Sequence, residues 1–282
     1  MGKLEGRVTV ITGGASGFGE ASGRLFVDEG ARLVIADIND ELGNRLAGEL
    51  GSAASYIHTD VTREAEVKAA VDHAVDKFGR LDIMFNNAGI TGGAGGGIDE
   101  IDVETFDITL AVHLRGVMLG MKHAAPIMKK QGSGSIINMG SMSGLHTGWG
   151  PHAYSAAKAG IIHLTKTVAM ELGPNNIRVN SICPTWISTP LFGNALGLSE
   201  EDSKKLGDRL TEDFKKLHPI PYECTADDVA KLALFLASDD SSFISGQALA
   251  IDGAAGCGRS LATFMDETIV PAFTAVLGTE QD

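Results

Sequence analysis

Short apolar runs, rich in β-branched residues, alternate along this chain with longer stretches of helical periodicity. The runs at 8–11, 33–36 and 83–85 are continuously apolar, as expected for strands buried on both faces of a parallel sheet. A helical stretch lies between successive runs, and parallel neighbours require such a crossover. The pattern therefore predicts an α/β fold with a doubly wound, seven-stranded parallel sheet and helices on both faces. The expected strands are 7–11, 32–36, 54–58, 81–85, 135–139, 178–182 and 247–251, and the expected helices are 17–30, 40–50, 63–78, 103–131, 152–172 and 226–237.

One domain is predicted for residues 1–282, because neither a shift in composition nor an internal repeat divides the chain. Two segments fall outside the alternation. The first, about 185–222, is polar and helix-forming, and an insertion of this length in a compact domain usually forms a lid or a binding element. The second, about 254–282, follows the last strand. Its apolar side chains predict that it packs on its own subunit or on a neighbouring one; they are Phe264, Ile269, Val270, Phe273 and Val276.

Charge and composition exclude several classes of protein. The chain has 23 Lys and Arg residues against 36 Asp and Glu residues, and a net charge of −13 repels the phosphates of a nucleic acid. It has no apolar run long enough to span a bilayer and no secretory signal pattern, so we expect a cytoplasmic protein that does not enter a membrane. Cys183, Cys224 and Cys257 form no C-x-x-C pair, so neither a metal site nor a disulfide framework is expected.

A glycine-rich turn follows the first expected strand. Its sequence, Thr12-Gly-Gly-Ala-Ser-Gly-Phe-Gly19, opens the first helix, where glycines permit a tight turn and let phosphate oxygens approach backbone N–H groups. The N-terminus of that helix would then face a pyrophosphate. A strand-to-helix turn without a ligand can carry the same glycines, and the turn alone leaves this alternative open.

The second expected strand ends in Asp37, 18 residues beyond the glycine turn, where a carboxylate can accept hydrogen bonds from the hydroxyls of an adenosine ribose. The same charge repels a 2′-phosphate, and neither Ser16 nor Ile38 supplies the cation that such a phosphate needs. NAD is therefore expected as the cofactor rather than NADP. The alternative role for Asp37 is a helix N-cap, for which Asn39 and Asp40 are equally suited.

Tyr154 and Lys158 lie four residues apart in a helical pattern, so their side chains share one helix face. A neighbouring ammonium, together with a positive nicotinamide ring, favours the phenolate and lowers the pKa of the tyrosine from its usual value of about 10. Such a pair is ordinarily a surface feature. Its position after the cofactor motifs favours the other interpretation, in which Tyr154 is a general acid or base.

Three motifs occur in a fixed order: Thr12-Gly13 with Gly17 and Gly19, then Asn86-Asn-Ala-Gly89 after the fourth strand, then Tyr154-x-x-x-Lys158. Their order and spacing resemble the short-chain dehydrogenase/reductase family over residues 5 to about 253. The resemblance implies a single-domain Rossmann fold and a homotetramer or homodimer built from the long helices at 103–131 and 152–172. From the residues alone, the Asn-Asn-Ala-Gly turn indicates only the end of a strand.

The resemblance also implies roles for individual residues. Ser141, 13 residues before Tyr154, would hydrogen-bond the substrate oxygen, and Ser143 is the competing candidate through ordinary turn chemistry. Lys158 would hold the nicotinamide ribose, and Thr189 would bind the carboxamide. The expected catalytic residues are Ser141, Tyr154, Lys158 and His113. The expected cofactor-binding residues are Gly13, Ser16, Gly17, Phe18, Gly19, Asp37, Ile38, Asp60, Val61, Asn87, Ala88, Gly89, Tyr154, Lys158, Pro184, Ile187 and Thr189.

The chain departs from the family pattern at two positions. His113 stands where many members carry an Asn that helps to hold a water connecting the catalytic lysine with solvent. Its imidazole could anchor the same water, could be a buried side chain satisfied by the backbone, or could titrate within the relay near pH ~6.5. Thr185 stands where the family often has Gly after Pro184, and this change would reshape the nicotinamide pocket.

The reaction implied is the interconversion of a secondary alcohol and a ketone. Pocket walls are expected in 91–97, 145–151 and 186–217, which carry few cations. Their apolar side chains favour a bulky aromatic or alicyclic substrate, and the alternative for them is lid packing or a subunit contact. These side chains are Trp149, Trp186, Leu191, Phe192, Leu196 and Phe214. The stretch Gly150-Pro-His-Ala-Tyr154 also resembles the branch that contains secoisolariciresinol dehydrogenase.

Two other classes share this fold. A cofactor-sensing regulator would bind the dinucleotide but normally lacks the Tyr and Lys pair, which this chain has. An epimerase or dehydratase of the extended branch usually has a longer C-terminal substrate domain. The favoured hypothesis is thus an NAD-dependent alcohol dehydrogenase or ketoreductase acting on a small molecule, with the regulator as its alternative.

Overall fold

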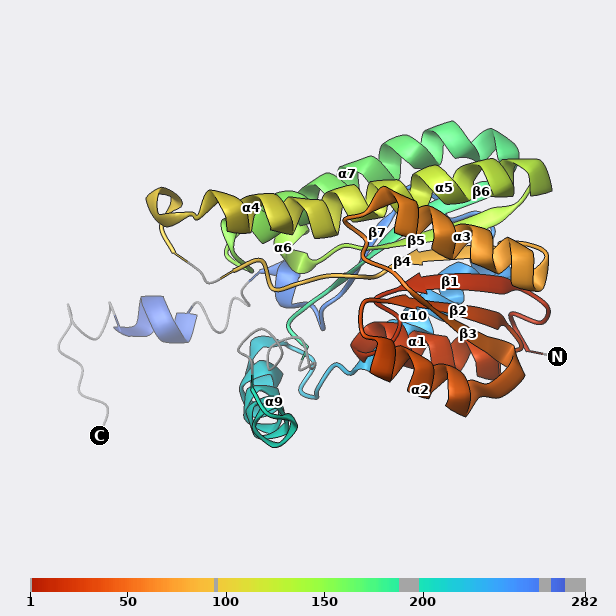
Figure 1. The fold of residues 1–282 in the computed structure, drawn as a ribbon. Helices are drawn as coiled ribbons and strands as arrows, with labels where there is room; N and C mark the ends of the chain where they lie inside the picture. Colours follow the sequence, from red (N-terminus) through yellow and green to blue (C-terminus); the bar gives the residue numbers. More distant parts are fainter. Residues whose placement is uncertain (1, 94–95, 188–197, 259–264, 272–282) are drawn as a thin grey trace.

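The computed structural model describes residues 2–93, 96–187, 198–258 and 265–271 (Figure 1). The strands within them are β1 (Val8–Thr12), β2 (Arg32–Asp37), β3 (Ala54–His58), β4 (Ile83–Asn86), β5 (Gly134–Met139), β6 (Ile177–Pro184) and β7 (Ala248–Ile251). They form one parallel sheet in the order β3-β2-β1-β4-β5-β6-β7, so the predicted doubly wound, seven-stranded fold is confirmed. Because the strand order reverses between β1 and β4, the loops after these strands border one crevice at the carboxyl edge of the sheet.

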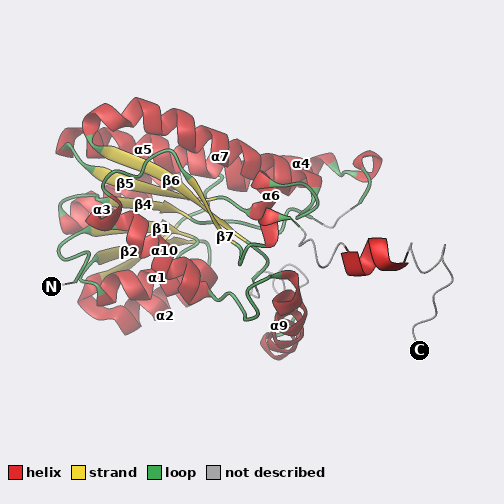
Figure 2. Cartoon of the chain, turned by 180° about the vertical axis from the view of Figure 1, so that it is seen from behind, coloured by secondary structure: helices red, strands yellow, loops and turns green. Residues whose placement is uncertain are grey.

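Helices cover both faces of the sheet (Figure 2). They include α1 (Gly17–Asp28), α2 (Asp40–Leu50), α3 (Glu64–Phe78), α4 (Val103–Leu110), α5 (Gly116–Gln131), α6 (Met142–Leu145), α7 (His152–Leu172), α9 (Glu200–Phe214) and α10 (Ala226–Ala237). α1, α2 and α10 pack on one face, and α3, α5 and α7 pack on the other. The predicted bounds at 40–50, 152–172 and 226–237 are confirmed. The first helix ends at Asp28 instead of residue 30, because the φ of Gly30 is +92°, outside the helical region.

The predicted helix at 103–131 is interrupted, so this prediction is wrong in its middle. α4 ends at Leu110, a π-helical turn (η3) covers Ala111–Arg115, and α5 begins at Gly116. The turn contains His113, which is buried and hydrogen-bonded outside the helix. A π turn inserts a residue into the helical ladder, and apolar periodicity does not reveal it because helix continues on both sides.

Two apolar layers hold the sheet between the helices. Alternate residues of a strand face opposite sides of the sheet, so Ile11 packs in the layer with α1 and α10, while Val10 packs in the layer with α3 and α5. Both side chains are fully buried. Burial of one such side chain contributes roughly 1.5–3 kcal/mol, which fixes the register of the strands and hence the positions of the loops at the carboxyl edge.

A buried chain of polar side chains ties α7 to the sheet. Nδ2 of Asn86 on β4 donates to Oδ1 of Asn138 on β5 at 2.8 Å, and Nδ2 of Asn138 donates to Oγ1 of Thr165 on α7 at 2.9 Å. Oγ1 of Thr165 donates to the carbonyl oxygen of Ile161 at 2.8 Å. Thr165 lies two helical turns beyond Lys158, so these bonds fix the rotation of the helix face that carries Lys158.

The structure describes parts of the two segments that fall outside the alternation of strands and helices. The insertion at 185–222 contains α9 and a 3-10 turn, η5 (Lys215–Leu217), and its residues 188–197 lie outside the described residues. The extension at 254–282 contains a π-helical turn, η8 (Met265–Ile269). The predicted packing of the extension and the single domain over 1–282 stay predictions.

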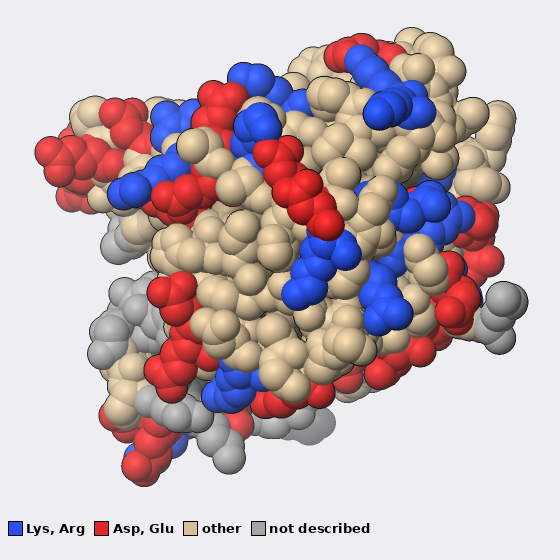
Figure 3. Space-filling view, turned by 45° about the vertical axis from the view of Figure 1, so that its right-hand side comes forward, with Lys and Arg blue, Asp and Glu red and all other residues tan. Residues whose placement is uncertain are grey.

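Charged groups of both signs share the surface. On the face shown in Figure 3, Lys and Arg side chains are interspersed with Asp and Glu side chains. No helix in the described part of the chain is long and apolar enough to cross a membrane. The three cysteines are free, and the described ranges hold no group of three or more His, Cys, Asp or Glu side chains arranged to bind a metal ion.

Candidate active site

A cavity of about 120 Å³ lies at the carboxyl edge of the sheet. It brings together predicted site residues from distant parts of the chain: Phe18 on α1, Ser141 after β5, Tyr154 on α7, and Pro184 and Ile187 at and after the end of β6. The other lining residues are Thr91, Met142, Ser143, Trp149, Gly150, Pro151, Thr185 and Trp186. Some predicted residues lie outside the described residues, namely Thr189, Leu191, Phe192 and Leu196.

The glycine turn packs directly on the loop that follows β4. A Cβ atom on Gly13 would lie 2.8 Å from Cα of Ala88, and one on Gly19 would overlap the carbonyl oxygen of Gly13, so neither position can hold a side chain. Oγ1 of Thr12 accepts hydrogen bonds from the N–H groups of Asn87 and Ala88 at 3.0 and 3.2 Å. The structure therefore joins the first two predicted motifs.

The N-terminus of α1 suits an anion. The helix begins at Gly17, whose φ is +54°, and the side chain of Ser16 makes no capping hydrogen bond. The first N–H groups of a helix lack partners within the helix and lie at the positive end of its dipole, so they can bind a phosphate. Ser16, Gly17 and Phe18 lie at this helix N-terminus, and their binding of a dinucleotide stays a prediction.

Asp37 ends β2 at the edge of the same crevice and is 9% exposed. Its Oδ2 accepts from the N–H of Ala15 at 3.0 Å and its Oδ1 from the N–H of Asn39 at 2.9 Å, which leaves further lone pairs for ribose hydroxyls. The side chain of Asn39 caps α2 by accepting from the N–H of Leu42, so the helix-cap alternative for Asp37 is wrong. Ile38 beside it is exposed.

The residues expected around the adenine lie after β3. Oδ1 of Asp60 accepts from the N–H and the hydroxyl of Thr62 at 2.9 and 2.7 Å, which closes the turn before α3. The side chain of Val61 is buried and packs with Val67 and Leu119. It therefore holds the turn in place, and the adenine contacts of Asp60 and Val61 stay predictions.

Tyr154, Lys158 and Ser141 lie together at one side of the cavity. Nζ of Lys158 lies 5.3 Å from the centroid of the Tyr154 ring and donates to the carbonyl oxygen of Met139 at 2.7 Å. Ser141 lines the same cavity as Tyr154, and its Oγ accepts from the N–H of Ser143 at 3.1 Å. The predicted common helix face of Tyr154 and Lys158 is confirmed. Ser141 and Ser143 both line the cavity, so the choice of Ser141 over Ser143 stays a prediction.

Burial opposes the ionisation that the spacing of Tyr154 and Lys158 predicts. It raises the pKa of Tyr154, and the hydrogen bond with Ser141 acts in the opposite direction. Burial also lowers the pKa of Lys158 to about 7. Both effects arise because a charged group loses its hydration inside the protein. The ammonium of Lys158 alone therefore does not convert Tyr154 to the phenolate.

His113 lies behind Tyr154. Its Nε2 is 2.8 Å from the carbonyl oxygen of Ile90, and its ring meets the Tyr154 ring edge-on, with centroids 5.1 Å apart. Nδ1 is buried without a hydrogen-bonding partner among the described residues. Burial, together with the charge of Lys158, lowers the pKa of His113 to about 3. The imidazole is thus neutral at physiological pH, which does not support the alternative of a relay group that titrates near pH ~6.5.

Sequence reasoning assigned no contact to two residues that shape the site. Thr12 is the first residue of the glycine motif, and its hydroxyl holds the loop after β4. Gly92 has a φ of +78°, and a Cβ atom there would lie 2.9 Å from Cβ of Tyr154, so the backbone at Gly92 packs on the tyrosine. Gly92 lies in the expected pocket wall at 91–97, but its contact with Tyr154 leaves no local signal, because the two residues are 62 positions apart, by 154 − 92.

Comparison with known proteins agrees with this geometry. A family model described as enoyl-(acyl carrier protein) reductase matches residues 13–255. Momilactone A synthase of Oryza sativa subsp. japonica is 48% identical over 89% of this chain and 90% of its own length. Zerumbone synthase of Zingiber zerumbet and (+)-borneol dehydrogenase 2 of Salvia officinalis are each 43% identical over 89% of this chain, and over 95% and 89% of their own lengths. The chain belongs to the short-chain dehydrogenase/reductase family.

Members of this family are oxidoreductases that use a nicotinamide dinucleotide, NAD or NADP. The residues of this chain fit such a group. The positions of Gly13 and Gly19 admit no side chain, the first turn of α1 is not capped by Ser16, and Asp37 borders the same crevice. Those residues would hold the phosphates and the adenosine ribose.

The depressed pKa of His113 predicts a pH dependence of stability. The pKa of His113 is about 3 in the folded protein and 6.5 in the unfolded chain. Its contribution to the free energy of unfolding is therefore present above pH 6.5 and decreases as the pH falls below that value. The loss attributable to His113 is about 2 kcal/mol between pH 6.5 and 5. We expect His113→Asn, which does not titrate, to lack this loss in urea unfolding at the two pH values. An equal decrease in the free energy of unfolding between the two pH values in parent and variant would show that His113 is not buried in its neutral form.

Proposed function

We propose that the chain is an NAD-dependent oxidoreductase that interconverts a secondary alcohol and a ketone, with Tyr154 as the group that transfers the proton. The observation that carries the proposal is that Ser141 and Tyr154 line one cavity, which Phe18 of the glycine turn also lines. Lys158 is buried behind the tyrosine ring. A nicotinamide dinucleotide, when bound, supplies the hydride acceptor or donor.

In this proposal the substrate oxygen binds between the hydroxyls of Ser141 and Tyr154. Tyr154 takes the proton from an alcohol during oxidation and returns a proton to a carbonyl oxygen during reduction. Ser141 orients the oxygen through a hydrogen bond. Because burial raises the pKa of Tyr154, the phenol keeps its proton in the protein alone, and a positive charge nearby is needed to release it. The ammonium of Lys158, 5.3 Å from the ring, contributes part of that charge.

The lining of the cavity supports a bulky, mostly apolar substrate, aromatic or alicyclic. Trp149, Trp186, Met142 and Ile187 form its walls, and no Lys or Arg lines it within the described residues. An apolar cavity with few polar groups binds through shape and uses those groups for orientation. The relative named for borneol, a bicyclic secondary alcohol, supports the same substrate class.

Removal of the Tyr154 hydroxyl tests the proton-transfer role. We expect Tyr154→Phe to bind the dinucleotide with nearly the parent Kd, because the ring is retained, and to lose turnover by about 10²–10⁴-fold. The measurement is NADH absorbance with a panel of cyclic and benzylic secondary alcohols, together with a binding titration. Tyr222→Phe, which removes an exposed tyrosine hydroxyl, is the matched control. Full activity of Tyr154→Phe would assign the proton transfer to another residue. If the parent binds the dinucleotide but turns over no alcohol of the panel, the cofactor-sensing regulator is favoured instead.

The preference for NAD is tested at Asp37. Asp37→Ala removes the carboxylate proposed to bind the ribose hydroxyls and to repel a 2′-phosphate. We expect the ratio of kcat/KM with NAD to that with NADP to fall by about tenfold or more. Asp40→Ala, which removes an exposed carboxylate at the start of α2, is the control and should leave the ratio near the parent value. An unchanged ratio in Asp37→Ala would contradict the ribose assignment.

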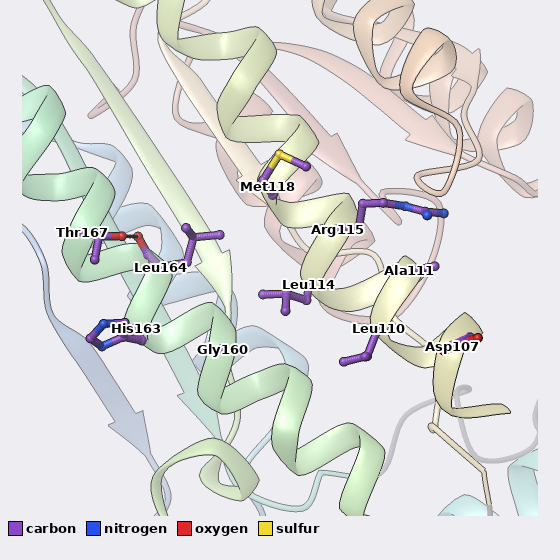
Figure 4. Close-up of a pocket in the computed structure, with 10 residues that line it drawn as sticks. All are labelled: Asp107, Leu110, Ala111, Leu114, Arg115, Met118, Gly160, His163, Leu164 and Thr167. Atoms are coloured by element: carbon purple, nitrogen blue, oxygen red, sulfur yellow. Dashed lines mark hydrogen bonds between the residues drawn. The ribbon is translucent and has the colours of Figure 1, made fainter. Parts of the chain in front are cut away.

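We also infer that a second copy of the chain covers an apolar groove between α4–α5 and α7, as in the homodimer or homotetramer that the sequence predicts. The groove has a volume of about 710 Å³, and Leu110, Leu114 and Leu164 lie within it (Figure 4). Asp107 and Arg115 of the same groove carry opposite charges, so a two-fold related copy can present each charge to the other. The remaining lining residues are Ala111, Met118, Gly160, His163 and Thr167.

A charge in the groove should weaken this association. Met118 is 38% exposed and lines the groove. We expect Met118→Glu to raise the dissociation constant of the oligomer by about tenfold or more, because an unpaired carboxylate would be buried at the interface. Light scattering during size-exclusion chromatography measures the change. Ile98→Glu, at an exposed isoleucine outside the groove, is the control, and an unaltered oligomer in Met118→Glu would place the interface elsewhere.

A further inference from the structure

The insertion after β6 returns to the body of the protein at a pair of buried side chains, Thr185 and His218. Oγ1 of Thr185 and Nε2 of His218 are 2.9 Å apart, and the residues are 9% and 8% exposed. Thr185 follows the last residue of β6 and lines the cavity, whereas His218 follows η5. A single buried hydrogen bond thus connects the two ends of the insertion, 33 positions apart.

The backbone on both sides holds this pair in place. The N–H of Thr185 donates to the carbonyl oxygen of Ile251 at 3.1 Å, which extends the pairing of β6 with β7. His218 and Ile220 each precede a proline, which favours extended backbone, and His218 has φ −112° and ψ 135°. The N–H of Ile220 donates to the carbonyl oxygen of Gly253 at 3.2 Å. Both partners are therefore anchored to β7 or to the turn after it.

The neighbouring residue, Trp186, makes a second contact with the insertion. Its ring packs on Phe214 at the end of α9, with centroids 5.7 Å apart and planes inclined by 49°. Trp186 and Thr185 both line the cavity, and Phe214 and His218 lie four positions apart. The insertion thus meets two consecutive residues of the cavity wall, one through a ring contact and one through a hydrogen bond.

We propose that Thr185 and His218 are positioning residues that hold Trp186 as a fixed wall of the substrate cavity, and that they thereby give the site its preference for bulky apolar substrates over small ones. The inference rests on the proposed function. A ring contact is tolerant of tilting, whereas a hydrogen bond between a hydroxyl and an imidazole is directional and is strengthened by burial. The pair acts on the wall and not on the proton transfer at Tyr154. Its loss should therefore change KM for bulky substrates and leave kcat unchanged.

The fluorescence of Trp186 tests the positioning without any substrate. The chain has two tryptophans, so in a Trp149→Phe background the emission comes from Trp186 alone. Thr185→Val removes the hydroxyl and keeps the shape, whereas Thr185→Ser keeps the hydroxyl. Loss of one neutral hydrogen bond should increase, by about twofold to tenfold, the fraction of molecules in which the Trp186 ring is displaced. We expect acrylamide quenching of Trp186 to increase in Thr185→Val and to stay near the parent value in Thr185→Ser.

Kinetics test the consequence for specificity. In Thr185→Val, KM for a bulky cyclic secondary alcohol should rise by about threefold to tenfold. In His218→Leu, which removes the other partner of the bond and lies outside the cavity lining, KM for the bulky alcohol should rise in the same way, whereas KM for a small acyclic secondary alcohol, kcat for both alcohols and Kd for the dinucleotide should stay near the parent values. Thr185→Ser should restore KM. A rise in KM that is equal for bulky and small alcohols, or that Thr185→Ser does not restore, would overturn the proposal.

A double-mutant cycle tests the bond itself. Thr185→Val leaves Nε2 of His218 without its partner, whereas Thr185→Val combined with His218→Leu removes both polar groups. If the bond is the cause, the double variant raises KM for the bulky alcohol no further than the single variants do. Additive effects, or unchanged quenching of Trp186 in Thr185→Val, would show that the pair does not hold the wall. The quenching needs no turnover, so its result is independent of whether Tyr154 transfers the proton.

Discussion

The attachment of α7 to β5 is the interaction on which the rest of the site depends. Two buried hydrogen bonds join consecutive residues at the end of the strand, Asn138 and Met139, to Thr165 and Lys158 on the helix. Two contacts at separate turns prevent the helix from rotating or sliding on the sheet. The tyrosine one turn before Lys158 is then held at the cavity that Ser141, which follows the same strand, also lines. The geometry of the candidate site is thus a consequence of core packing.

The same burial sets the electrostatics of the site. It disfavours the charged forms of Tyr154, Lys158 and His113, so the protein alone keeps the proton on the phenol. A group that holds its proton until a positive charge enters the crevice is suited to proton transfer that is coupled to oxidation or reduction. Phe18 of the glycine turn borders the same cavity, so the proposed dinucleotide site and the proposed proton-transfer group meet there.

The local part of the structure could be predicted from the sequence, and the long-range part could not. Periodicity gave the strands and the bounds of α2, α7 and α10, and spacing located Asp37 at the end of β2. The bond of His113 to the loop after β4 and its π turn depend on a partner 23 positions away. Thr185 was recognisable as unusual, but His218 was not recognisable as its partner. The raised pKa of Tyr154 could not be predicted because burial is a property of the folded chain.

The ionisation of Tyr154 tests this account most directly. The chain has three tyrosines, so the ultraviolet absorbance of the Tyr154 phenolate can be isolated by subtracting the spectra of Tyr154→Phe across a pH titration. In the protein alone, Tyr154 should titrate above its ordinary pKa of about 10, because the surrounding protein removes part of the hydration that the phenolate needs. With an oxidised nicotinamide dinucleotide present, whose ring is positively charged, the pKa should fall. An identical titration with and without the oxidised dinucleotide would contradict the role of Tyr154 in proton transfer.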